Sequence, residues 1–130
     1  MRLRIVVVDD NSHTAAGFAA LLSSWGHDVR TADGGWEAVQ CAREFGPDVV
    51  LLDIGKPDVC GYEAARRLRS ECPENKLRLI AVTEHPQREH KVRAYEAGCD
   101  AHLVKPIEED AFKAMLARFQ RMAAARAQIE

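Results

Sequence analysis

Residues 49–53 read Val-Val-Leu-Leu-Asp, and this stretch gives the clearest indication of the fold. Consecutive apolar residues without polar alternation are typical of a strand that is covered on both faces, as in a parallel sheet. Similar runs rich in Val, Ile and Leu precede and follow this stretch along the chain. The predicted strands are residues 3–8, 27–31, 49–52, 77–82 and 101–104.

Segments with a helical spacing of apolar residues lie between and after these runs. Ser12 and Asp33 are predicted N-caps, Gly26, Gly46 and Gly98 are predicted helix ends, and one helix is predicted to begin near Pro86. Strands that alternate with helices predict an α/β fold, a doubly wound parallel sheet of five strands with five helices. We expect one domain over residues 1–130. The apolar stripes are Ala15, Phe18, Leu22 and Trp25; Ala38, Ala42 and Phe45; Tyr62, Ala65 and Leu68; and Phe112, Met115, Leu116, Phe119 and Met122.

The composition is that of an ordinary soluble domain and gives no sign of a nucleic-acid or membrane partner. The chain has 130 residues, of which 47% are hydrophobic and 29% charged, and its formal net charge is -2. Arg66, Arg67 and Arg69 are interpreted as a solvated helix face. The first apolar run stops at Asp9, too early for a signal peptide or a membrane span, so we expect a cytoplasmic protein.

The cysteines do not have the spacing of a metal site. None of the four forms a Cys-x-x-Cys pair with another, so we expect free thiols in a reducing compartment rather than a zinc centre. The cysteines are Cys41, Cys60, Cys72 and Cys99.

Polar side chains gather at the predicted carboxyl ends of the strands, where α/β folds bind their ligands. Asp9 and Asp10 follow the first strand, Asp53 stands at the end of the third, the fourth ends in Thr83, and Lys105 follows the fifth. Carboxylates this crowded repel one another unless a cation compensates, and Mg²⁺ or Mn²⁺ is the natural occupant of an all-oxygen site. A carboxylate oxygen of Asp53 could then bond to phosphorus, while Lys105 and Thr83 contact the phosphoryl oxygens.

Four motifs jointly resemble the receiver domain of two-component signal transduction, over essentially the whole chain. They are Val-Val-Asp9-Asp10-Asn11, Leu-Leu-Asp53-Ile-Gly-Lys-Pro-Asp-Val-Cys-Gly61, Ala-Val-Thr83, and Ala-Gly98-Cys-Asp-Ala-His-Leu-Val-Lys105-Pro106. The resemblance implies a flavodoxin-like, chemotaxis-regulator-like fold with strand order 2-1-3-4-5. It also implies a phosphoprotein that catalyses only its own phosphorylation and dephosphorylation and turns over no separate substrate.

The resemblance assigns roles by position. Asp53 matches the phosphoacceptor and a metal ligand, Asp10 a metal ligand, Asp9 an acidic residue that acts on the metal through water, and the Gly55 carbonyl a further metal contact. Lys105 matches the phosphate-binding lysine. Thr83 matches the switch hydroxyl, and the Lys105–Pro106 bond matches one that the family holds in cis. The phosphodonor would be a phosphohistidine on a sensor histidine kinase or a histidine phosphotransfer protein.

Three residues depart from the family pattern: His102, Glu84 and Cys60, which stands where Asp is common and is interpreted as structural. His102 stands where a Tyr or Phe switch residue is usual, and it could make signalling pH-sensitive or be a strand histidine without a special role. Glu84 follows Thr83 where small residues are common, and could repel a phosphoryl group or point to solvent. His85 could influence hydrolysis of the phosphate.

Several alternatives stay open at this point. A phosphatase of the haloacid-dehalogenase type would need a second Asp at position 55, where Gly55 stands, and no nucleotide-binding glycine motif follows a strand. A pseudo-receiver that acts as an unphosphorylated protein-interaction module is the stronger rival. The chain could be a stand-alone regulator, a phosphorelay intermediate or a domain of a hybrid kinase. We expect residues 89–97, His102 and the last helix to form the output surface toward an unknown protein target, and a candidate homodimer interface.

Overall fold

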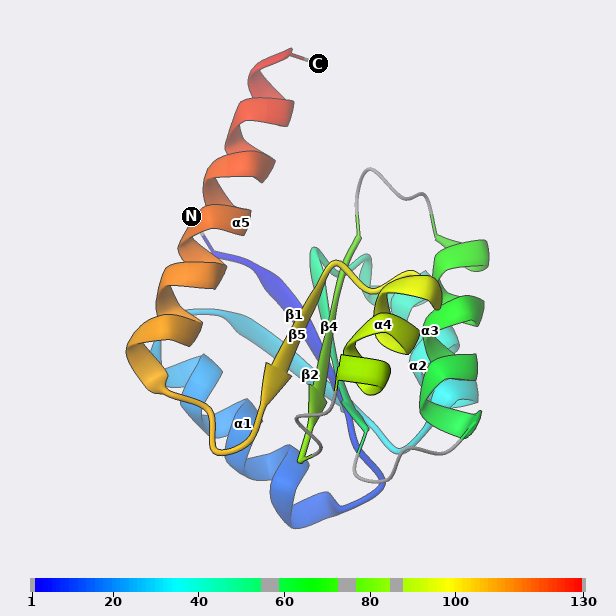
Figure 1. Ribbon diagram of the computed structural model, residues 1–130. Coiled ribbons are helices and arrows are strands. Elements are labelled where there is room, and N and C mark those ends of the chain that lie inside the picture. Colours follow the sequence, from blue (N-terminus) through cyan, green and yellow to red (C-terminus); the bar gives the residue numbers. More distant parts are fainter. Residues whose placement is uncertain (1, 55–58, 73–76, 85–87, 130) are drawn as a thin grey trace.

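The computed structural model describes residues 2–54, 59–72, 77–84 and 88–129. Strands and helices alternate through the whole chain, as the apolar pattern predicted (Figure 1). The elements are β1 (Arg4–Val8), α1 (Ser12–Ser24), β2 (Asp28–Ala32), α2 (Gly35–Phe45), β3 (Val49–Ile54), α3 (Val59–Glu71), β4 (Arg78–Thr83), α4 (Arg88–Glu96), β5 (Ala101–Val104) and α5 (Glu109–Ile129).

The strands form one parallel sheet in the order β2-β1-β3-β4-β5, which confirms the predicted doubly wound fold. The order reverses between β1 and β3, because the chain first builds outward to β2 and then crosses back to the other side of β1. Ligands of such sheets bind beside this reversal, at the carboxyl ends of the strands. The fold therefore directs attention to the ends of β1 and β3.

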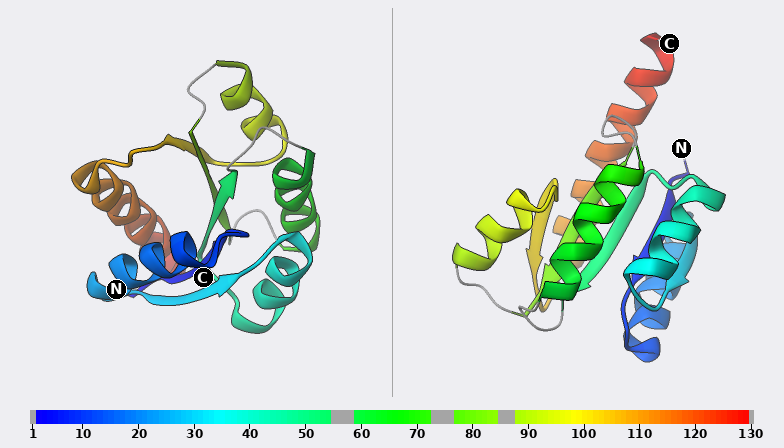
Figure 2. Two further views of the ribbon diagram at one scale, coloured as in Figure 1. Left: turned by 90° about the horizontal axis from the view of Figure 1, so that it is seen from below. Right: turned by 90° about the vertical axis from the view of Figure 1, so that its right-hand side faces the viewer.

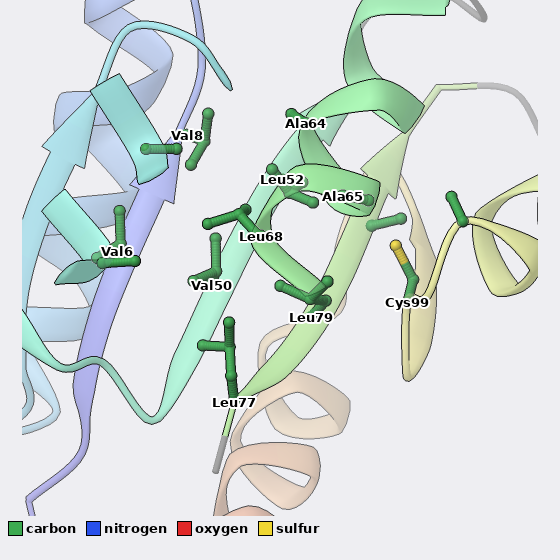
Figure 3. Packing of buried hydrophobic residues seen from close by; sticks show 14 of the residues in the cluster. Val6, Val8, Val50, Leu52, Ala64, Ala65, Leu68, Leu77, Leu79 and Cys99 are labelled. Atoms are coloured by element: carbon green, nitrogen blue, oxygen red, sulfur yellow. The ribbon is translucent and has the colours of Figure 1, made fainter. Parts of the chain in front are cut away.

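Helices cover the two faces of the sheet (Figure 2). Each face has its own apolar core. α2, α3 and α4 cover one face, where Leu68 and Leu79 are fully buried (Figure 3). α1 and α5 cover the other face, where Leu22, Leu51 and Phe112 are buried. Burial of one such side chain contributes about 1.5–3 kcal/mol, so both faces of the central strands stabilise the fold.

Three strands extend beyond their predicted apolar runs, and in β3 and β4 the extension includes a polar residue of the candidate site. β3 continues through Asp53 to Ile54, and β4 continues to Thr83. In the register, Asp53 pairs with Val82 and Ile54 with Thr83. These two residues of the candidate site are thus held by the strand ladder rather than by the loops that follow.

Both predicted N-caps are wrong by one residue. Asn11, not Ser12, caps α1, and its side-chain oxygen accepts hydrogen bonds from the backbone N–H groups of His13 and Thr14. Gly34, not Asp33, caps α2, and it makes no side-chain hydrogen bond. The Asp33 N–H instead donates to the Glu37 side chain in the first turn of α2. The carboxylate that accepts a hydrogen bond at this helix start therefore comes from within the helix and not from the residue before it.

The glycine signals for helix ends are confirmed. Gly46 ends α2 with a φ of 63°, and Gly98 follows α4 with a φ of 107°, a left-handed backbone conformation that favours glycine. Gly26 after α1 also has a positive φ. The predicted start of the fourth helix at Pro86 lies outside the described residues, and α4 is described from Arg88.

Arg69 does not belong to a solvated helix face, which corrects the sequence interpretation. Its side chain is only 14% exposed, and its guanidinium donates to the carbonyl oxygens of Gly98 (2.6 Å from Nη2) and Leu77 (2.7 Å from Nη1). Nη2 also lies 2.7 Å from Asp100 Oδ2, which accepts the Leu79 N–H as well. Arg69 therefore ties α3 to the start of β4 and to the turn between α4 and β5.

The described cysteines are free, as predicted. Cys41, Cys72 and Cys99 form no disulfide, and burial raises the pKa of the Cys99 thiol to about 12. A thiol with so high a pKa stays protonated and unreactive at neutral pH. The side chain of Cys60 lies outside the described part of the chain.

Candidate functional site

Asp53 and Lys105 form an ion pair at the carboxyl end of the sheet. Lys105 Nζ lies 2.6 Å from Asp53 Oδ2, and the Asp53 side chain is only 3% exposed. The backbone N–H of Lys105 donates to the Thr83 carbonyl at 2.8 Å, which anchors the lysine beside the end of β4. The peptide bond from Lys105 to Pro106 is cis, as the resemblance implied. The lysine thus supplies a fixed positive charge beside a buried carboxylate.

Asp9 is a second buried carboxylate beside Asp53. It is 6% exposed, and its Oδ1 accepts the Asn11 N–H at 3.0 Å. Burial raises the pKa of Asp9 to about 6; the Asn11 N–H opposes this rise, the neighbouring Asp53 carboxyl adds to it, and Lys105 lowers the pKa. Asp9 Oδ2 is buried without a hydrogen-bond partner in the described structure. Such an oxygen is costly to bury unless another group satisfies it.

Of the remaining predicted metal contacts, the structure describes only Asp10. Asp10 is exposed, and Gly55 lies outside the described residues. Within the described ranges, no three acidic, histidine or cysteine side chains converge closely enough to form a metal-binding group. The two buried carboxylates and the orphaned Asp9 oxygen nevertheless suit a hard divalent cation, because such ions take carboxylate oxygens together with carbonyls and several waters.

Thr83 and Glu84 stand next to each other but face different surroundings. Thr83, the last residue of β4, is 3% exposed and lies beside Ile54 and Val104 in the sheet. Glu84 is exposed and lines a groove that Lys105 also lines. The structure therefore brings Thr83 to the same sheet edge as Asp53, and it places Glu84 at the approach to that edge. His85 lies outside the described residues.

His102 lies in β5 and is half-buried. It pairs with Ala81 in the sheet, and its Nε2 atom is buried without a hydrogen-bond partner in the part of the chain that the structure describes. Burial lowers the pKa of His102, and its electrostatic interactions with Lys91 and His90 on α4 lower it further. Both effects disfavour the protonated form of His102.

The site also includes residues that the sequence reasoning missed. Asn11 orients Asp9 through its backbone N–H and caps α1 through its side chain. Glu109, the first residue of α5, lines the same groove as Glu84. An Asn directly after a pair of aspartates is a recognisable capping signal, but nothing local in the sequence shows that Glu109 and Glu84 share a groove.

Comparison with known proteins identifies the family. The family model described as "Response regulator receiver domain" matches residues 5–117. This chain belongs to the response regulator receiver domain family. Receiver domains are signalling modules rather than enzymes with a separate substrate; they interact with histidine kinases and downstream effectors, and they generally use a divalent metal for phosphorylation.

Similar proteins align with more than four fifths of this chain. Protein PilH of Pseudomonas aeruginosa is 36% identical over 107 residues, which is 82% of this chain and 88% of PilH. The polar-differentiation response regulator DivK of Brucella ovis is 31% identical over 112 residues, 86% of this chain and 91% of DivK. The solved BeF3-activated receiver domain of DrrB is 28% identical, has a TM-score of 0.78 and matches 93% of this chain and 99% of its own.

Among the described residues of this receiver domain, no helix is both long and apolar enough to span a membrane.

Proposed function

We propose that this receiver domain accepts a phosphoryl group on Asp53 from a phosphohistidine of a sensor histidine kinase or a histidine phosphotransfer protein. The observation that carries the proposal is the 2.6 Å contact between Lys105 Nζ and Asp53 Oδ2 beside the buried Asp9 carboxylate. In the transfer, an Asp53 carboxylate oxygen bonds to phosphorus and the donor's N–P bond breaks. The electron pair of that bond remains on the donor imidazole nitrogen.

Each residue of the site would contribute to this step through charge or position. Asp9, Asp10 and Asp53, with the carbonyl of Gly55, would hold Mg²⁺ or Mn²⁺, which supplies positive charge to the phosphoryl oxygens. Lys105 would leave its contact with the Asp53 carboxylate and bind a phosphoryl oxygen. The hydroxyl of Thr83 would donate a hydrogen bond to another. Positioning and charge neutralisation are what phosphoryl transfer chiefly requires.

The added phosphate would then alter the face formed by α4, β5 and α5. A phosphoryl group adds about two negative charges at the end of β3, and Thr83 and Lys105 would move to meet them. Thr83 pairs with Val104 in β5, two residues beyond His102, so a shift of β4 is transmitted directly to the edge strand. We propose this face as the output surface toward a protein target, or toward a second copy of the domain.

Intact-mass analysis tests the proposed function. With acetyl phosphate and Mg²⁺, the wild type should gain the mass of one phosphoryl group, and the gain should disappear in EDTA. Asp53→Asn removes the attacking oxygen anion but keeps the shape of the side chain, so it should gain no mass under any condition. A folded wild type that never gains phosphate from any donor would instead favour the pseudo-receiver.

His102 should make folding stability depend on pH. Because the pKa of His102 is lowered in the folded state, the unfolded chain binds its proton more readily below pH about 6.5, and stability falls as pH decreases through this range. His102→Phe removes this proton uptake. We expect the wild type to lose stability relative to the variant by up to about 1.4 kcal/mol per pH unit on acidification.

Urea unfolding of both proteins between pH 5 and pH 8 measures the effect, and the difference between them cancels other titrating groups such as His27. The spectral shift caused by phosphorylation, recorded over the same pH range, tests whether His102 also affects switching. Parallel stability curves and identical spectral shifts at every pH would show that His102 has neither role.

A further inference from the structure

A groove lined by Lys105, the ion-pair partner of Asp53, lies on the side of the sheet that α1 and α5 cover. It has a volume of about 670 Å³ and lies between α1 and the connection from β5 to α5. Phe18 and Leu21 of α1 form one wall, and Ile107 and Phe112 form the other. Lys105 belongs both to the groove and to the ion pair with Asp53, so the groove lies next to the proposed phosphoacceptor.

Glu84 reaches this groove because it directly follows β4, beside the sheet face that α1 and α5 cover. Val49 and Leu51 of β3, and Ile80 and Val82 of β4, all pack in the core under α1 and α5. Glu84 is the residue after the end of β4, and it lines the groove together with residues of α1 and α5. Glu84 therefore lies on the approach to Asp53 rather than on the α4 side of the sheet.

The charge at the mouth of the groove is negative. Glu84 and Glu109 both line the groove, and both are exposed. Neither carboxylate forms an ion pair within the described ranges, and the ammonium group of Lys105 is already paired with Asp53. A cleft with one sign of charge and apolar walls concentrates ligands of the opposite sign and repels ligands of the same sign.

We infer that Glu84 and Glu109 select the phosphodonor by charge. They favour a donor protein that presents lysine or arginine side chains beside an apolar contact surface, and they disfavour small anionic donors. A donor that docks in this groove contacts both the apolar walls and the two carboxylates. It therefore needs apolar side chains against the walls and basic side chains against the carboxylates, because an apolar or acidic group there would leave each carboxylate uncompensated. This inference rests on the proposed phosphorylation of Asp53 and adds to it which donor is accepted.

The first arm of the test uses acetyl phosphate, an anion, as the donor. Glu84→Gln and Glu109→Gln remove the charge and keep the side-chain shape, and Glu44→Gln on α2 is a matched control far from the groove in the fold. We expect Glu84→Gln to be phosphorylated about tenfold faster than the wild type at low salt, and Glu109→Gln several-fold faster, with the gain shrinking as salt screens the charge. Glu44→Gln should react at the wild-type rate.

The second arm uses two synthetic amphipathic phosphohistidine peptides with the same apolar residues. Lysines flank the phosphohistidine in one peptide and glutamates flank it in the other. In each reaction the N–P bond breaks, the O–P bond to Asp53 forms, and the released imidazole takes a proton from water. The wild type should react about tenfold faster with the lysine peptide, and Glu84→Lys combined with Glu109→Lys should reverse this preference.

The outcomes separate the inference from the function on which it rests. If Asp53 is phosphorylated but the glutamine variants react at the wild-type rate, the inference is overturned and the proposed function stands. Equal rates with the two peptides overturn it as well. If no donor phosphorylates the folded wild type, both the function and the inference are wrong.

Discussion

Lys105→Met is expected to slow the phosphorylation of Asp53 by about 10²–10³-fold, the usual loss when one preorganised charge is removed from a transition state. Lys105 Nζ is 2.6 Å from Asp53 Oδ2 and is anchored through its backbone to Thr83, so solvent cannot easily replace it. The same change leaves the Asp53 carboxylate buried without its ion-pair partner. We therefore also expect a loss of about 3 kcal/mol in the free energy of unfolding in EDTA.

Lys113→Met is the matched control for this prediction. Lys113 is an exposed lysine of α5 whose Nζ lies 5.0 Å from the Trp25 ring, on the helix that follows Lys105. Its loss should cost no more than about 1 kcal/mol and should leave the phosphorylation rate unchanged. Rates come from intact-mass time courses with acetyl phosphate and Mg²⁺. A Lys105→Met protein that reacts at the wild-type rate would remove the lysine from the proposed mechanism.

Arg69→Met should lower the free energy of unfolding by about 2–4 kcal/mol, the usual cost of removing a charged donor from two poorly solvated carbonyl oxygens. The guanidinium donates to the carbonyl oxygens of Gly98 and Leu77, and the variant leaves both without this donor. Asp100 is exposed and keeps its contacts with Arg78 and the Leu79 N–H, so its loss of Arg69 adds little. Methionine keeps much of the apolar stem, so the loss reports the hydrogen bonds and the charge rather than a cavity.

Arg67→Met on the same helix is the control. The Arg67 side chain is 54% exposed and lies 3.7 Å from Glu63, an exposed pair that contributes about 0.3–0.5 kcal/mol at most. Urea unfolding of both variants, with thermal melting as a second measurement, gives the comparison. Equal losses in the two variants would show that Arg69 is no more than another surface arginine.

The sequence determined the fold, because its strongest signals are local and agree with one another. Uninterrupted apolar runs such as residues 49–52 suit only strands covered on both faces, and Gly46 and Gly98 supply the backbone conformation with which helices end. Boundaries were less well determined. Asp53 and Thr83 lie inside strands because sheet pairing continues past the last apolar residue, which no periodicity reveals.

The candidate site was predicted in the same way, since the carboxyl ends of parallel strands must meet at one edge. Asp9, Asp53, Thr83 and Lys105 do lie there. The sequence alone could not rank them by exposure: Asp9 is buried with a raised pKa, whereas its neighbour Asp10 is exposed. That difference depends on how β1 turns into α1, where Asn11 fixes the Asp9 carboxylate.

Tertiary structure alone decided the features that join residues distant in the sequence. Arg69 reads as one of several surface arginines until the fold brings Gly98 and Asp100 to it from residues 29 and 31 positions away. Glu84 and Glu109 likewise become a pair of charges only where α1 and α5 close the groove around them. Hydrophobic periodicity records which face of an element is buried, whereas the partners of a polar side chain depend on how the elements pack.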